Sequence, residues 1–142
     1  GYMNIQKSIF KLLRVCFSFI FLWAFADKTF GLGFKTTVEN AWINGGSPTY
    51  GFLTHGVKGP FVEFFQSLAG MPLIDWLFML GLLSAGILLL VRKWTRIGSF
   101  VGGMLFFLMY IAAMPPESNP LIDDHIIYIL VLALIATERR EK

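Results

Sequence analysis

Four long runs of apolar residues constrain this fold more than any other feature of the sequence. They cover about residues 10–30, 73–91, 97–114 and 121–137. A helix needs about 20 mostly apolar residues to cross the hydrocarbon core of a bilayer. Each run is close to that length, so the sequence predicts an all-α integral membrane four-helix bundle, formed by the whole chain as one domain.

The composition supports a lipid environment. Hydrophobic residues make up 56% of the 142 residues and charged residues 15%, whereas soluble domains have about 25% charged residues. The single cysteine, Cys16, excludes an internal disulfide, a CxxC redox pair and an iron–sulfur site. The sequence has no nucleophile, P-loop or dinucleotide motif, and its two histidines lack the spacing of a metal site.

The distribution of charge orients the four runs. Nine of the twelve basic residues flank one set of ends, and seven of the nine acids lie at the other. Basic loops stay in the cytoplasm, so both termini are expected there. The basic residues lie between apolar runs and form no single patch, which argues against nucleic acid as a partner. The basic set is Lys7, Lys11, Arg14, Arg92, Lys93, Arg96, Arg139, Arg140 and Lys142; the acidic set is Asp27, Glu39, Glu63, Asp75, Glu117, Asp123 and Asp124.

The first apolar run has an alternative interpretation. Its basic start, its apolar centre and the sequence Ala24-Phe25-Ala26 also resemble a signal peptide with a cleavage site. We favour a retained span, because removing it would leave three spans and a loop too long for its neighbours.

The outer loop, residues 31–72, is the only sizeable region between spans. Residues 60–70 read PFVEFFQSLAG, which is apolar but too short to cross a bilayer. Pro60 is suited to a helix start, and Gly70 and Pro72 to its end. We therefore expect a short interfacial or re-entrant helix here.

Ionisable residues gather at the outer ends of the spans. The fourth run has only twelve uncharged residues from Ile126, about 18 Å of helix, so it must include Asp123, Asp124 and His125 to cross. The first run likewise carries Asp27 and Lys28 near its outer end. Ionisable groups at one depth in a bundle indicate a binding site. The aromatic residues expected to line an apolar pocket beside them are Phe61, Phe64, Phe65, Trp76 and Tyr110.

Each of these residues also has a structural interpretation. Asn119-Pro120 fits a helix start, where Asp123 and Asp124 would favour the positive end of the helix dipole. Lys28 would extend to the headgroups with Asp27 as a local counter-charge, and His125 would be an interfacial hydrogen-bonding residue. Adjacent residues point about 100° apart on a helix. We expect Asp27 to face inward, toward His125, and Lys28 to face the headgroups or the outer loop.

Several segments resemble the DoxX/DoxD-type membrane proteins: LLRVCFSFIFLWAFADKTFG, GGSPTYGFL, GPFVEFFQSLAG, WLFMLGLLSAGILLL and PPESNPLIDDHIIYILVL. The most specific pieces are Asp27-Lys28 and the stretch from Asn119-Pro120 to Asp124-His125. The resemblance covers nearly the whole chain and implies a four-helix protein of the bacterial cytoplasmic membrane. DoxD members are linked to thiosulfate:quinone oxidoreductase, and others are membrane partners in oxidoreductase or thiol-stress complexes.

The expected function is a membrane subunit or partner of an oxidoreductase system that binds a quinone-like apolar molecule near the outer leaflet. Lys28, Asp124 and His125 would supply its polar contacts. The candidate binding residues are Asp27, Lys28, Trp76, Asp123, Asp124, His125 and Tyr128. The alternative is a non-catalytic scaffold that docks a partner protein through its outer loop. Expected partners are the lipid bilayer, another membrane or secreted oxidoreductase protein, and a second copy of the chain.

The expected orientation can be tested by labelling single cysteines in a Cys16→Ser background. Ser47→Cys and Ser118→Cys should react with a membrane-impermeant reagent added from outside, and Thr95→Cys only from inside. Labelling of Thr95→Cys from outside would reverse the orientation.

Overall fold

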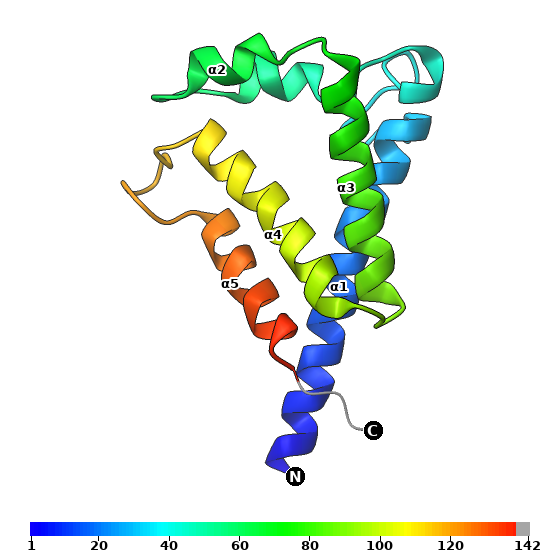
Figure 1. Ribbon diagram of the computed structural model, residues 1–142, viewed down its shortest axis with the longest axis vertical. Helices are drawn as coiled ribbons and strands as arrows, with labels where there is room; N and C mark the ends of the chain where they lie inside the picture. Colours follow the sequence, from blue (N-terminus) through cyan, green and yellow to red (C-terminus); the bar gives the residue numbers. More distant parts are fainter. Residues whose placement is uncertain (139–142) are drawn as a thin grey trace.

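The computed structural model describes residues 1–138, which form an all-helical fold with no β-strand in that range. Four helices form the body, and smaller elements lie across one end of it (Figure 1). The elements are α1 (Tyr2–Phe30), the 3₁₀ turn η1 (Trp42–Asn44), the π-helical turn η2 (Phe52–Gly56), α2 (Val62–Ser67), α3 (Pro72–Leu90), α4 (Thr95–Ala112) and α5 (Asp124–Ala136). Arg139, Arg140 and Lys142, which were counted with the inner basic residues, lie outside the described residues.

Three of the helices, α1, α3 and α4, are long and apolar enough to cross a membrane. The bounds of α3 and α4 agree with the expected runs to within about two residues. The first helix starts at Tyr2, earlier than expected, because good helix formers such as Gln6 and Lys7 continue it beyond the apolar run. The last helix is shorter than the expected run 121–137: α5 has 13 residues, about 20 Å.

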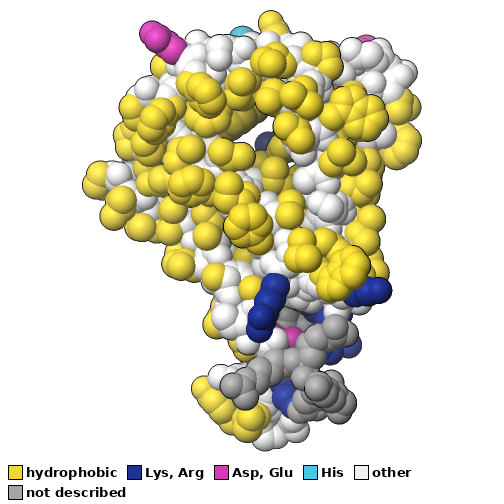
Figure 2. All heavy atoms as spheres, viewed as in Figure 1, with side chains coloured by type: hydrophobic (Ala, Val, Ile, Leu, Met, Phe, Trp, Pro, Cys, Tyr) yellow, Lys and Arg dark blue, Asp and Glu magenta, His cyan; other side chains and the backbone are white. Residues whose placement is uncertain are grey.

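The body is a series of neighbouring helix pairs. Helix α1 packs along α3, α3 along α4 and α4 along α5, while α1 and α5 share a smaller contact (Figure 1). Aromatic side chains join the pairs at the centre, where the rings of Phe21 and Phe106 lie 5.3 Å apart. Hydrophobic side chains also cover most of the face in Figure 2, the arrangement expected of a body surrounded by lipid. The buried core residues are Phe17, Phe21, Met79, Leu82, Ala85, Leu89, Phe106, Leu132 and Ile135.

Two polar side chains of α1 bond to the backbone of α3. Arg14 is only 7% exposed, and its guanidinium donates to the carbonyl oxygens of Leu89 and, at 3.2 Å, Leu90. These carbonyls belong to the last turn of α3, where no intrahelical donor remains. One turn along α1, the Ser18 hydroxyl donates to the Gly86 carbonyl at 2.6 Å. A Cβ at Gly86 would come within 2.5 Å of Leu22 Cγ, so a glycine permits this close approach.

An outer layer, residues 31–71, covers the ends of the helices. It contains η1, η2 and α2, and α2 lies across the top of the body (Figure 1). The short helix expected within residues 60–70 is thus present, over Val62–Ser67. A second cluster of buried residues fixes the layer to α4: Leu53, Val57 and Phe65 pack with Ala112. The backbone contributes as well, since the Lys58 N–H donates to the Ala112 carbonyl at 3.0 Å.

Basic side chains gather at the opposite end. On the face in Figure 2, Lys and Arg side chains lie around the narrow end of the molecule, near the termini. The turn between α3 and α4 is also basic, and its Lys93 Nζ lies 4.9 Å from the centre of the Trp94 ring.

We expect Arg14→Leu to lower the stability of the purified protein in detergent by about 1.5–3 kcal/mol. This is the range for losing a hydrogen bond from a charged donor while its buried acceptors remain. Thermal unfolding followed by circular dichroism measures the loss. Lys11→Leu, at an exposed position on the same helix, is the matched control. An equal change in the two variants would contradict a capping role for Arg14.

Candidate functional site

A cavity of about 480 Å³ lies between the outer layer and the outer halves of α3 and α4. Figure 2 shows an opening among the hydrophobic side chains of this region, with a basic side chain visible inside it. The lining is almost entirely apolar, and one basic residue, Lys28, belongs to it. The lining residues are Lys28, Pro48, Thr49, Phe52, Leu53, Phe64, Phe65, Leu68, Ile74, Leu77, Phe78, Leu105, Leu108 and Met109.

Helical spacing produces two walls of the cavity. Ile74, Leu77 and Phe78 of α3 lie at positions i, i+3 and i+4, and so share one face of the helix. Leu105, Leu108 and Met109 repeat the same spacing on α4. The two walls therefore offer aliphatic and aromatic surface from adjacent helices.

The outer layer closes the cavity from above. Phe64 and Phe65 come from α2, and their rings meet edge to face with centres 5.2 Å apart. Phe52 and Leu53 come from η2, and Thr49 from the segment before it. The roof thus depends on how residues 47–68 are held against the helices.

Asp75 holds one side of that roof. Its carboxylate Oδ1 accepts hydrogen bonds from the Ser47 hydroxyl at 2.7 Å, the Thr49 hydroxyl at 2.6 Å and the Thr49 N–H at 3.2 Å. Asp75 lies in the first turn of α3 and is buried. The acid thereby fixes residues 47–49 at the rim of the cavity, and its role there is structural.

Asp27 holds another part of the outer layer. It is only 2% exposed, and its carboxylate accepts from the N–H groups of Phe34 at 3.2 Å and Lys35 at 2.8 Å. Inward burial was expected, but the predicted direction toward His125 is wrong. The turn after α1 has N–H groups that need an acceptor, and the short carboxylate at the end of the helix reaches them.

Lys28 points in a different direction from Asp27 and lines the cavity. The expected orientation toward the headgroups or the outer loop agrees with the structure in its second form, because Lys28 lines the cavity together with outer-layer residues such as Phe52 and Phe64. Among residues 1–138, its amine makes no hydrogen bond and no close ion pair, although the charge of the neighbouring Asp27 attracts it. The nearest acid in sequence, Asp27, is bonded to the outer layer. A half-buried ammonium in an apolar cavity is costly unless a ligand supplies an acceptor.

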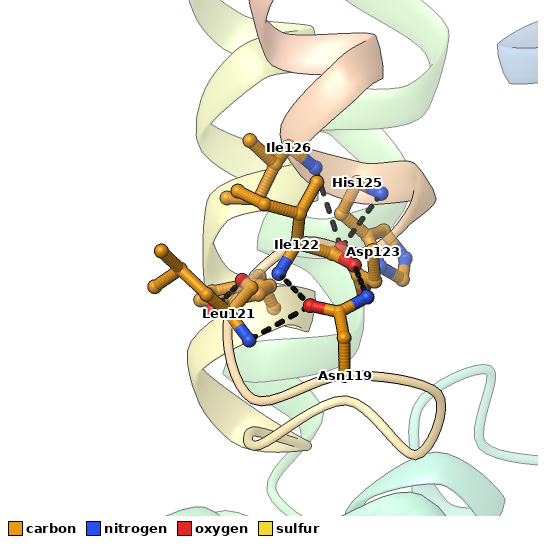
Figure 3. Close-up of polar contacts among 7 residues, drawn as sticks. Asn119, Leu121, Ile122, Asp123, His125 and Ile126 are labelled. Carbon is orange, nitrogen blue, oxygen red and sulfur yellow. Dashed lines mark hydrogen bonds and ion pairs between the residues drawn. The ribbon is translucent and has the colours of Figure 1, made fainter.

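The acidic and histidine residues at the start of α5 cap that helix and do not form a pocket (Figure 3). Asp123 is the N-cap, and its Oδ1 accepts from the N–H groups of His125 at 2.9 Å and Ile126 at 3.3 Å. Its Oδ2 lies 2.8 Å from His125 Nδ1. The Asn119 side chain accepts from the Leu121 and Ile122 N–H groups and so shapes the loop before the cap. The helix start expected at Asn119-Pro120 is therefore wrong: these residues belong to the loop, and α5 begins at Asp124 with Asp123 as its N-cap. The expected place of Asp123 and Asp124 at the positive end of the helix dipole agrees with the structure.

The remaining candidates pack elsewhere. The Tyr128 ring lies 5.8 Å from Phe17 and 5.2 Å from Phe106, within the core. Trp76 is 55% exposed and packs on Trp42 with ring centres 4.8 Å apart. Of the seven candidates, only Lys28 lines the cavity, and neither Asp124 nor His125 does.

The expected aromatic lining is present in part. Phe64 and Phe65 line the cavity as expected, whereas Phe61, Trp76 and Tyr110 do not. The Tyr110 hydroxyl instead donates to the Leu121 carbonyl. Sequence reasoning missed the aliphatic walls, although their repeated i, i+3, i+4 spacing was a usable signal.

The described residues contain no group of three or more His, Cys, Asp or Glu side chains arranged to hold a metal ion. The chemistry available in the cavity is therefore that of one amine among apolar groups: hydrogen bonding or ion pairing to a ligand head, and hydrophobic contact with the rest. Comparison with protein-family models, curated proteins and solved structures gives no match to this chain.

The different roles of Asp27 and Lys28 predict different effects on stability. Asp27→Ala leaves two N–H groups without their acceptor and should cost about 1–3 kcal/mol. Asp27→Asn should cost less, because the amide oxygen still accepts a hydrogen bond. Lys28→Met should be neutral or stabilising, since it removes a poorly solvated charge. Thermal unfolding in detergent gives the comparison, and a larger loss for Lys28→Met than for Asp27→Ala would contradict these assignments.

Proposed function

We propose that this chain is a multi-pass membrane protein that binds a quinone-like apolar molecule in the cavity at Lys28. The observation that carries the proposal is the amine of Lys28, which makes no hydrogen bond or close ion pair with the described residues and lines a largely apolar cavity. A quinone has a ring to pack against Phe64 and Phe65, and carbonyl oxygens that accept a hydrogen bond from an ammonium. Ligand sites generally combine apolar walls with few polar groups that fix orientation.

The proposal includes a membrane location and an orientation for the chain. Four spans, with both termini on the cytoplasmic side, are favoured by the charge pattern of the sequence. The cavity would then lie near the outer leaflet of a bacterial cytoplasmic membrane. The resemblance to DoxX/DoxD-type proteins supports a link to an oxidoreductase system, in which this chain would present the molecule to a partner. His125 and Asp124 are left out of the proposed site because they do not line the cavity.

A second candidate function is a scaffold that docks another protein. The observation in its favour is the apolar surface of the outer layer, where Phe34, Val38 and Ile43 are each more than half exposed. Exposed apolar patches of this kind often mark sites of interaction with other proteins. The two candidates differ in their dependence on Lys28, because docking through these residues does not involve the cavity.

Titration with a short-chain benzoquinone tests the first proposal. Purified protein in detergent should bind the quinone saturably, as measured by calorimetry. Lys28→Met should weaken binding about tenfold to a hundredfold, the effect of losing a hydrogen bond from a charged donor. Leu108→Trp should fill the cavity and abolish binding, whereas Leu80→Trp, on the exposed face of α3, should leave it intact.

His125→Ala is the control for the excluded residues. It should bind the quinone as the unchanged protein does, because His125 lies outside the lining. Equal affinity for the unchanged protein and Lys28→Met would overturn the assignment of the site. Absence of saturable binding would favour the scaffold function.

A further inference from the structure

A second hollow lies between α4 and α5, toward the end where α4 begins. It is a groove of about 750 Å³. Its floor is made by small residues, Ser99 and Gly103 of α4 and Ala133 and Ala136 of α5. A Cβ added at Gly103 would meet no atom within 4 Å, so the groove is open at that point. Its volume and apolar walls suit a hydrocarbon chain.

Ser99 provides a polar point within the groove. The residue is 4% exposed, and its hydroxyl has no hydrogen-bond partner among the described residues. Buried hydroxyl groups are nearly always bonded. Ser99 belongs to the groove lining, and its buried hydroxyl without a partner therefore points to a ligand with a hydrogen-bonding group at that depth.

Arg96 provides a positive charge at the mouth of the same groove. It is exposed, and no acceptor among residues 1–138 lies within hydrogen-bond distance of it. Its basic neighbours are occupied: Arg92 lies 3.5 Å from Glu138, and Lys93 lies over the Trp94 ring. The N-terminal turn of α4 adds the positive end of a helix dipole. The groove thus has a cationic mouth and an apolar floor.

We propose that this groove binds one anionic glycerophospholipid, with its phosphate at Arg96, an ester group at Ser99 and an acyl chain over Gly103. Arg96 and Ser99 are three residues apart on α4, which separates them by about 4.5 Å along the axis. The order along the groove is therefore charge, hydrogen-bond donor and apolar surface, the same order as phosphate, ester and chain in the lipid. The site is separate from the cavity at Lys28, and it does not depend on the function proposed for that cavity.

A second copy of the chain is the competing occupant. Ser99 and Gly103 have the small-xxx-small spacing that lets transmembrane helices pack closely. Charge favours the lipid. Among the described residues, the only acid at this end is Glu138, which already pairs with Arg92. Another copy would therefore offer no described acid to Arg96, whereas the phosphate of a lipid does.

Native mass spectrometry of the delipidated protein tests the proposal with phosphatidylglycerol and phosphatidylcholine of identical chains. The protein should bind one phosphatidylglycerol in preference to phosphatidylcholine. Arg96→Gln should weaken phosphatidylglycerol binding about fivefold, the effect of one basic residue near an anionic lipid. Ser99→Ala should weaken both lipids, and Gly103→Leu should remove both by filling the groove. Lys93→Gln is the matched control and should leave the preference unchanged.

Two outcomes would overturn the proposal. If Lys93→Gln weakens binding as much as Arg96→Gln, the attraction is diffuse and the groove is not a site. If Gly103→Leu converts a dimer to a monomer without affecting lipid binding, the groove is an interface between copies. Ser99→Ala keeps the test decisive if Gly103→Leu does not fold, because the Ser99 hydroxyl makes no bond within the described protein.

Discussion

The structure depends on how its buried charges satisfy the backbone. In an apolar environment each free N–H or carbonyl group is costly, and the ends of helices have the most of them. Arg14 supplies donors to the end of α3, and Asp27 supplies acceptors to the turn after α1. Asp123 does the same at the start of α5. Asp75 holds residues 47–49. Charged side chains that would be energetically unfavourable if exposed to lipid thereby join the helices to each other and to the outer layer.

Lys28 is the exception to this pattern, and the exception defines the cavity. Its amine makes no hydrogen bond to a carbonyl or carboxylate of the described residues, although it lies at the same end of the molecule as three acids that accept hydrogen bonds from backbone N–H groups: Asp27, Asp75 and Asp123. The difference arises from geometry: Asp27 is turned toward the loop, and Lys28, one residue on, is turned about 100° away. The acid stabilises the turn after α1, at the start of the outer layer, while the base lines the cavity.

Much of the fold could be predicted from the sequence, because it depends on length and composition alone. The runs at 73–91 and 97–114 became α3 and α4 with nearly the expected bounds. The fourth helix is shorter, since Asp123 bonds to backbone N–H groups and ends the loop there. The candidate site was harder to predict. The direction of Asp27 depends on the path of residues 31–35, and the cavity lining depends on residues 48–53 folding over distant helices. No periodicity within a single run contains that information. Phe64 and Phe65 were foreseen because a short apolar helix must place its aromatic face somewhere apolar.

The position of the cavity opening has a consequence for what controls its occupancy. The outer layer covers the cavity from above, and the opening lies on the apolar face of the body (Figure 2). A molecule that enters there must first dissolve in the surrounding lipid. Its effective concentration is then its mole fraction in the bilayer, not its concentration in water. Two compounds with the same contacts to Lys28 would differ in apparent affinity by the ratio of their partition coefficients. Other apolar solutes dissolved in the membrane would compete for the cavity even if they made no specific contact with Lys28.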